Sequence, residues 1–356
     1  MSKNIVVFSD GTRQTGGEGN PTNIYQMFKM MENRTPRQVV FYDAGVGTGW
    51  QRVTGSAAGM GISRNIREGY RFVFEQYEAG DRIYLFGFSR GAATVRSLSS
   101  FIHHFGILPK SRPELIKKAW KIYRRRNRSS FEKKRDDFVA RYPPMSATVC
   151  VLGCYDTVAA LGLPVPWANS LLDGIPLFRH KFHDFKLSMG VEHAFHALAI
   201  DEERKAFRPV LWDADVEQNQ TLDQVWFAGM HSDVGGGYAE RGLSDIALVW
   251  LTRHAVDQGL LLYRPDRIEI AEDCDQVAHD SRSKGVAKLF RRQVRSWDSD
   301  RRGPPVLHGS VQVRAASEGL QNSARYAPWI LDDGAEHEVD EWVRLDDAPL
   351  LDDARP

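Results

Sequence analysis

The stretch IYLFGFSRGAATVRSLSSF, residues Ile83 to Phe101, runs from an apolar segment through a turn of small residues into a helical pattern. Gly87 and Gly91 lie two positions before and two positions after Ser89. A very sharp turn needs small residues at such positions, because side chains there would collide with the neighbouring backbone. The stretch therefore predicts a strand, a tight turn and a helix, with Ser89 at the turn.

Other apolar segments continue this alternation of strand and helix along the chain. Strands are expected in 4–10, 37–43, 147–156 and 221–230, and helices in 63–80, 90–106 and 243–259. Such alternation predicts an α/β fold with a mostly parallel sheet and helices on both faces. Within that fold, the G-x-S-x-G pattern around Ser89 is typical of the nucleophile elbow of an α/β-hydrolase-like fold.

A nucleophilic serine needs a base, and the base needs an acid that orients it. In this fold the chain order is serine, then acid, then histidine, each just beyond the carboxyl end of a strand. Asp156 follows the strand ending CVLGCY, and His231 follows VWFAGM and precedes a run of glycines. The order Ser89, Asp156, His231 is therefore the predicted catalytic triad.

Backbone N–H groups beside the serine should stabilise the negative charge that develops on the substrate oxygen. Arg90 follows Ser89 directly, and the FSDGT turn after the first strand offers Gly11 or Thr12 as the second donor. Asp10 in that turn also raises the possibility of an aspartyl-phosphate enzyme. Phe8 occupies the position where that chemistry requires the nucleophilic aspartate, so this alternative is rejected.

Three further residues are predicted to support the site without reacting, namely Asp10, Asp233 and His308. A metal is not predicted, because His193 and His196 are three residues apart but no third ligand stands at a metal-binding spacing. The predicted site therefore relies on side chains and backbone N–H groups.

Composition limits the classes of partner and compartment. The 356 residues carry a net charge of +1, so the overall field predicts no nucleic-acid partner. Three cysteines argue against a disulfide framework. The apolar run at the N-terminus is too short for a signal peptide, and no run has the length of a membrane span. We expect a protein that is cytoplasmic as made, with any export using no cleavable signal peptide.

Two basic segments raise the question of peripheral membrane contact. The first, 117–128, is expected to be a surface helix that packs on the core rather than a lipid-binding one. The second, 280–303, is expected as a basic helical insertion, and docking on anionic lipid and an ordinary solvated surface are equally open for it. The predicted division is a catalytic domain in 1–330 and an acidic C-terminal segment in 331–356.

Several motifs together resemble one known family, the bacterial α/β hydrolases that include the first family of type VI secretion phospholipase effectors. The motifs are VVFSDGT, PTNIYQM, FYDAGVGTG, GFSRGA, YDTVAALG, HALAIDEERKAF, VWFAGMHSDVGGGY and LHGSVQVR, which span most of 4–314. The resemblance implies a serine esterase or lipase with Ser89, Asp156 and His231 as its triad, and no cofactor. It implies an acyl ester or phospholipid as substrate, and secretion machinery or an immunity protein as partners.

Two alternatives stay open from the sequence. The same triad would serve an esterase or amidase acting on a soluble small substrate. A catalytically silent scaffold that keeps the fold is the alternative of a different class, and the intact serine, aspartate and histidine argue against it.

Overall fold

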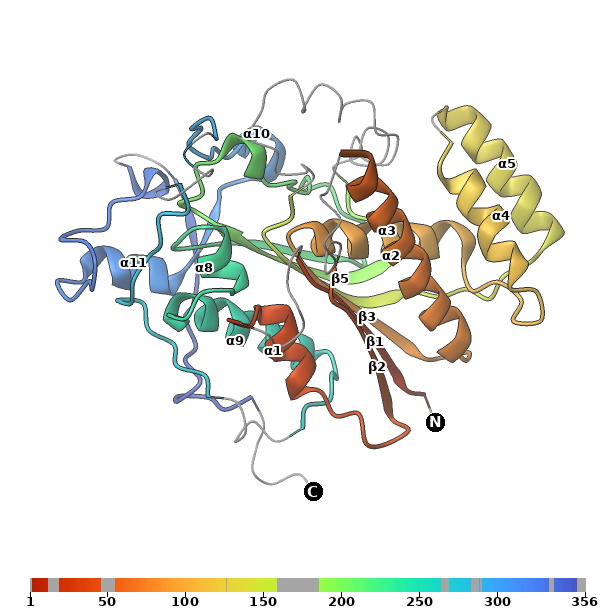
Figure 1. Ribbon diagram of the computed structural model, residues 1–356, viewed down its shortest axis with the longest axis horizontal. Coiled ribbons are helices and arrows are strands. Elements are labelled where there is room, and N and C mark those ends of the chain that lie inside the picture. The colour runs from red at the N-terminus through yellow and green to blue at the C-terminus, as the bar shows by residue number, and fades with distance from the viewer. Residues whose placement is uncertain are drawn as a thin grey trace.

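The structure is a computed structural model, and it describes residues 2–11, 19–45, 55–125, 127–158, 186–263, 269–282, 288, 290–332 and 336–350. Within these residues eight parallel strands form one sheet, in the order β2-β1-β3-β4-β5-β6-β7-β8 (Figure 1). The strands are β1 (Asn4–Ser9), β2 (Gln38–Asp43), β3 (Arg82–Phe88), β4 (Val149–Tyr155), β5 (Val191–Ala199), β6 (Thr221–Phe227), β7 (Val306–His308) and β8 (Glu338–Asp340). The predicted fold class is confirmed.

Helices cover both faces of this sheet. One face is covered by α2 (Gly55–Gln76), α3 (Arg90–Phe105), α4 (Glu114–Tyr123) and α5 (Arg128–Arg141). The other is covered by α1 (Asn23–Met30), α8 (His231–Gly235) and α9 (Gly242–Asp257). The remaining helices described are η1 (Lys205–Phe207), α10 (Ser299–Arg302), α11 (Gly309–Ala316) and η4 (Trp329–Leu331).

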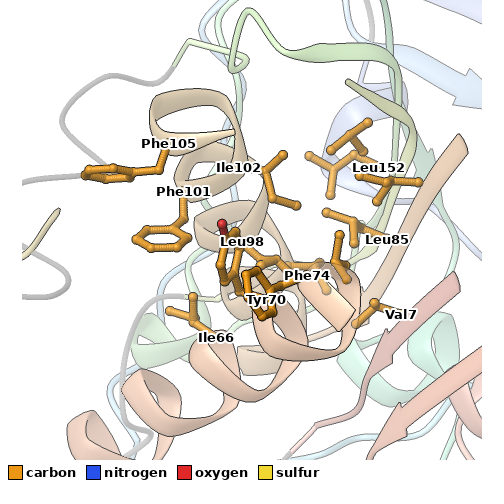
Figure 2. Packing of buried hydrophobic residues seen from close by; sticks show 14 of the residues in the cluster. Val7, Ile66, Tyr70, Phe74, Leu85, Leu98, Phe101, Ile102, Phe105 and Leu152 are labelled. Carbon is orange, nitrogen blue, oxygen red and sulfur yellow. The ribbon is translucent and has the colours of Figure 1, made fainter. Parts of the chain in front are cut away.

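The packing of α2 and α3 follows from their apolar spacing. Ile66, Tyr70 and Phe74 recur every four residues on α2, so they share one face of the helix. They pack with Leu98 and Phe101 of α3 above the sheet, as Figure 2 shows. The rings of Tyr70 and Phe101 meet edge to face at 4.7 Å. Burying each such side chain stabilises the fold by about 1.5–3 kcal/mol, which fixes α3 and hence the turn that precedes it.

The last strand comes from the acidic C-terminal segment. β8 pairs with β7 in parallel, so the chain beyond 331 extends the same sheet. Trp250 on α9 donates its indole N–H to Asp340 Oδ2 at 2.7 Å, which anchors the strand to the neighbouring helix. The sequence segment from 331 therefore contributes to the sheet that also carries the predicted site.

The structure describes only part of the basic helical insertion expected in 280–303, because residues 283–287 and 289 lie outside the described residues. Residues 291–298 contain no helix, and the four-residue α10 is the one α-helix described in the segment. Arg204 and Arg292 form an antiparallel bridge, so this part of the segment lies as extended chain against the loop after β5. A helix of alternating basic and apolar residues would have left Arg295 in solvent, whereas its side chain is buried.

Candidate active site

The turn between β3 and α3 has the geometry of a nucleophile elbow. Ser89 adopts φ 57° and ψ −117°, a region that residues with a side chain rarely occupy. A Cβ on Gly91 would lie 1.9 Å from the carbonyl oxygen of Ser9, and one on Gly87 would lie 2.5 Å from that of Gly91. The glycines predicted from the sequence are therefore required by close approach of the backbone. The Ser89 side chain makes no capping bond to α3, so its hydroxyl is available to another group.

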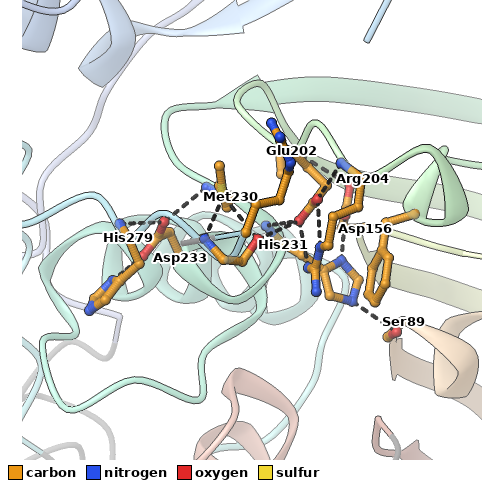
Figure 3. Close-up of polar contacts among 12 residues, drawn as sticks. Ser89, Asp156, Glu202, Arg204, Met230, His231, Asp233 and His279 are labelled. Carbon is orange, nitrogen blue, oxygen red and sulfur yellow. Dashed lines mark hydrogen bonds and ion pairs between the residues drawn. The ribbon is translucent and has the colours of Figure 1, made fainter. Parts of the chain in front are cut away.

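That group is His231, at the start of α8. Its Nε2 lies 2.8 Å from Ser89 Oγ, and its Nδ1 lies 2.5 Å from Asp156 Oδ2 (Figure 3). With the Nδ1 proton donated to the carboxylate, Nε2 is left to accept the serine proton. The structure thus brings together all three residues predicted from chain order, from the ends of β3, β4 and β6.

Asp156 is held more tightly than the other two. Asp156 is fully buried. Its φ is 39°, and among the described residues only Asp156 and Ser89 have a positive φ without being glycine. Arg295 donates to Oδ1 at 2.6 Å and to Oδ2 at 2.8 Å, and the backbone N–H of Ala199 donates to Oδ1 at 3.2 Å. Burial alone would raise the pKa of Asp156, but the Arg295 guanidinium overcomes this effect and holds the pKa well below 3.8.

Aromatic rings enclose the histidine. Phe88 lies 4.6 Å from the His231 ring and Phe207 lies 5.0 Å from it, between ring centroids. Arg204 stacks on the outer face of Phe207 at 3.5 Å and pairs with the buried Glu202. These rings keep water from one side of the imidazole, which strengthens its bonds to Ser89 and Asp156.

Asp233, predicted as a supporting residue, caps the helix that begins with His231. Its Oδ2 accepts from the Met230 N–H at 2.9 Å and from the His279 N–H at 3.1 Å. The ring of His279 also contacts Asp233 Oδ1 at 2.6 Å, and this hydrogen bond raises the pKa of His279. Figure 3 shows this pair on the side of α8 away from Ser89. Asp233 therefore positions the start of α8 through the backbone.

The turn after β1 lies beside the elbow. A Cβ built on Gly11 would be 3.8 Å from the Ser89 Cβ, so this turn borders the serine as predicted. The Gly11 N–H, however, donates to Asp10 Oδ1 at 2.6 Å and is thereby directed away from an oxyanion. Thr12, the other candidate in this turn, lies outside the described residues. Arg90 is the first residue of α3 and directly follows Ser89. Its N–H is one of the N-terminal N–H groups of the helix, which have no carbonyl partner within the helix.

Asp10 and His308, the remaining predicted support residues, have different surroundings. Asp10 is buried and accepts from Thr22 Oγ1 and from the Tyr42 hydroxyl, each at 2.7 Å. His308 caps α11 through Nδ1, which lies 2.9 Å from Ser310 Oγ. Burial lowers the pKa of His308 to about 3, so the ring is neutral at ordinary pH. These contacts make His308 part of the β7–α11 junction and not of the triad.

Arg295, Glu202 and His279 were not predicted as site residues. Glu202 stands inside a charged run, 201–205, and His279 stands alone between Ala278 and Asp280, so neither has a spacing that indicates a role. Arg295 was placed in the basic segment 280–303, for which lipid docking and an ordinary solvated surface were equally open. Burial of one arginine in such a run leaves no signal in the local pattern.

The described residues form neither a metal-binding cluster nor a membrane-spanning helix. Among the described residues, no three histidine, cysteine, aspartate or glutamate side chains are grouped so that they could hold a metal ion. No helix in the described ranges combines the length and the apolarity needed to cross a bilayer.

Comparison with known proteins gives a family match. The model for the catalytic domain of Tle1-like phospholipase effectors of type VI secretion matches residues 3–254. A yeast relative, the uncharacterized protein YEL023C of Saccharomyces cerevisiae, is 29% identical over 234 residues, which covers 58% of this chain and 32% of that protein. The chain thus spans about a third of the length of this curated relative.

Two solved structures are similar at 16% sequence identity. An uncharacterized protein from Pseudomonas aeruginosa has a TM-score of 0.42, covering 76% of this chain and 48% of that one. The Tle1 effector bound to the VgrG spike of the type 6 secretion system has a TM-score of 0.34, covering 67% of this chain and 52% of that one.

Proposed function

The chain belongs to the family of Tle1-like type VI secretion phospholipase effectors, whose catalytic domain its residues 3–254 match, and we propose that it is a serine hydrolase of phospholipid acyl esters. The observation that carries the serine mechanism is the pair of short hydrogen bonds from Ser89 through His231 to Asp156. The family description supports the substrate class.

In the proposed first step, Ser89 Oγ attacks the ester carbonyl carbon while His231 Nε2 takes the hydroxyl proton. The tetrahedral intermediate collapses when its bond to the leaving alcohol breaks, and His231 returns the proton to that alcohol. Asp156 stays ionised throughout and stabilises the imidazolium, which its low pKa favours. An acyl group remains on Ser89.

In the second step, water attacks the acyl carbon and His231 again takes and returns one proton. The fatty acid leaves, and Ser89 recovers its hydroxyl hydrogen. The Arg90 N–H at the start of α3 is the proposed donor to the oxyanion in both steps, because it follows Ser89 and belongs to the positive end of the helix dipole. Phe88 and Phe207 would exclude water other than the attacking molecule from the imidazole.

The direct test is turnover by Ser89→Ala, measured on a soluble nitrophenyl ester and on phospholipid vesicles. We expect kcat to fall by up to about 10⁶-fold on both substrates, since the nucleophile is lost. Wild-type Ser89 should also be labelled by a fluorophosphonate, with the modified residue located by peptide mass. Ser97→Ala is the matched control, because Ser97 is a buried serine of the same helix and no triad member.

Three results would contradict the proposal. Near-normal turnover by Ser89→Ala would exclude the serine mechanism. Cleavage of peptides or amides with no cleavage of either ester would reassign the reaction. Absence of both turnover and labelling in the wild type would favour a catalytically silent scaffold.

We extend the proposal to delivery, because the family is described as one of type VI secretion effectors. The chain would then bind a component of that machinery. Co-purification of the tagged chain with the spike protein of such an apparatus tests this, and absence of co-purification would confine the proposal to the ester hydrolase activity.

A further inference from the structure

Arg295 lies outside the part of the chain that matches the family, which ends at residue 254, yet it contacts the predicted triad acid. Its side chain is 2% exposed. We propose that Arg295 is a positioning residue that sets the orientation and the ionised state of Asp156, so that the segment after α9 completes the active site. The inference rests on the proposed function for its kinetic consequences, although the geometry stands independently.

The contacts of Arg295 form a four-point arrangement. Its Nη1 donates to Asp156 Oδ1 and to the carbonyl oxygen of Ala199, at 2.6 and 2.5 Å. Its Nη2 donates to Asp156 Oδ2 and to the carbonyl oxygen of Phe207, each at 2.8 Å. The two parallel bonds hold the carboxylate in one orientation about its Cβ–Cγ bond. In that orientation Oδ2 faces His231.

The same guanidinium joins three parts of the site. Asp156 directly follows β4, Ala199 ends β5, and Phe207 belongs to η1 and carries the ring that packs on His231. Moving Arg295 would therefore shift both the acid and one wall of the imidazole pocket. Asp156 also has a positive φ, so its backbone alone does not favour the orientation observed.

The charges around Asp156 leave Arg295 as its principal counter-ion. His231 faces the carboxylate directly, and His196 on β5 accepts the N–H of Thr157 at 3.1 Å. Burial lowers the pKa of His196 to about 3, so it supplies no positive charge at ordinary pH. Glu202 adds negative charge near His231 but is paired with Arg204. Without Arg295, burial should raise the pKa of Asp156.

A merely structural arginine would behave differently from a positioning one. Its removal would lower the thermal midpoint but leave kcat and the pH profile of the folded fraction unchanged. Loss of a positioning residue should lower kcat with little change in KM. It should also move the acidic limb of the kcat/KM profile to higher pH, because protonated Asp156 no longer accepts the His231 Nδ1 proton.

The experiment compares Arg295→Ala and Arg295→Lys with Arg291→Ala, an exposed arginine of the same segment. On the soluble ester we expect kcat of Arg295→Ala to fall on the order of 10²-fold, as for a misplaced catalytic group. Arg295→Lys keeps the charge but not the two-point contact, so it should fall between Arg295→Ala and wild type. Added guanidinium ion should restore part of the activity of Arg295→Ala and none of that of Ser89→Ala.

A wild-type kcat and acidic limb in folded Arg295→Ala or Arg295→Lys would overturn the inference. An equal loss in Arg291→Ala would do so too, since it would show general disruption of the segment. If Arg295→Ala does not fold, the kinetics of Arg295→Lys decide the question.

A readout without turnover separates this inference from the proposed function. The proton in the 2.5 Å bond between His231 and Asp156 should give a proton NMR signal well downfield of the amides in the wild type. We expect that signal to shift or vanish in Arg295→Ala and to persist in Arg291→Ala. If the wild type hydrolyses no ester, the proposed function fails, but an altered signal still supports the positioning role and an unchanged one overturns it.

Discussion

The turns after β1 and after β4 flank the elbow of β3 on either side, and each places a buried aspartate beside it. Asp10 and Asp156 are 1% and 0% exposed. Burial raises the pKa of Asp10 to about 6, although Thr22, Tyr42 and the Gly11 N–H donate to it. The pKa of Asp156 lies below 3.8, because Arg295 overcomes the same burial.

This difference shows that neutral hydrogen-bond donors and a cation have unequal effects on the pKa of a buried carboxylate. Hydrogen bonds from neutral groups offset only part of the cost of removing the charge from water, whereas a guanidinium in direct contact offsets more. Asp156 is therefore held as an anion, which its proposed role requires. Asp10 takes up its proton already near pH 6, and its carboxyl serves the turn beside Ser89.

The largest expected effect concerns Asp156→Asn. The asparagine has no net charge and can present its amide to His231, which favours the wrong tautomer of the imidazole. We expect kcat on a soluble ester to fall on the order of 10⁴-fold. Asp10→Asn, measured in the same assay, should keep most of the wild-type kcat. Equal losses in both variants would break the distinction between the two turns.

The next effect is on stability as a function of pH. The pKa of Asp10 is raised from 3.8 to about 6 by folding, so its contribution to stability is present below pH 3.8 and is lost as pH rises through 6. A shift of about two units corresponds to about 3 kcal/mol. We expect Asp10→Asn to be more stable than wild type by up to that amount near pH 8, with the advantage vanishing near pH 4.

Urea unfolding at the two pH values measures this difference. Asp156 has the opposite linkage, since a lowered pKa contributes stability above pH 3.8 that is lost as pH falls. Asp156→Asn should therefore destabilise the protein at neutral pH, where Arg295 would be left without its counter-ion. An Asp10→Asn advantage that did not change with pH would contradict the raised pKa.

The smallest effect is expected for Tyr42→Phe, which removes one donor to Asp10 Oδ2. A hydrogen bond to a charged acceptor is worth about 1.5–3 kcal/mol and one between neutral groups about 1 kcal/mol. The loss in unfolding free energy should therefore be larger near pH 8 than near pH 5. Tyr25→Phe is the matched control, because its ring lies 5.5 Å from that of Tyr42 and it lacks this bond. Identical losses at both pH values would show that Asp10 does not change its charge.

Prediction from the sequence succeeded where a local pattern carries the structure. The strand, turn and helix around Ser89 follow from an apolar run, two glycines and a helical period, all within twenty residues. It failed for β5, whose apolar residues are interrupted by His193 and His196, and for β7 and β8, which have three residues each. Short edge strands carry too few residues for a periodic signal.

The sequence by itself determined the class of fold, the elbow, and the order in which Ser89, Asp156 and His231 reach one edge of the sheet. These follow from periodicity and from the rule that parallel strands end at the same edge. The tertiary structure decided which charges are buried: it placed Arg295 against Asp156, the Asp233 carboxylate at the start of α8, and neutral donors around Asp10. The physical reason is that the energy of a charge depends on its distance from other charges and from water, and segments far apart in the chain set both.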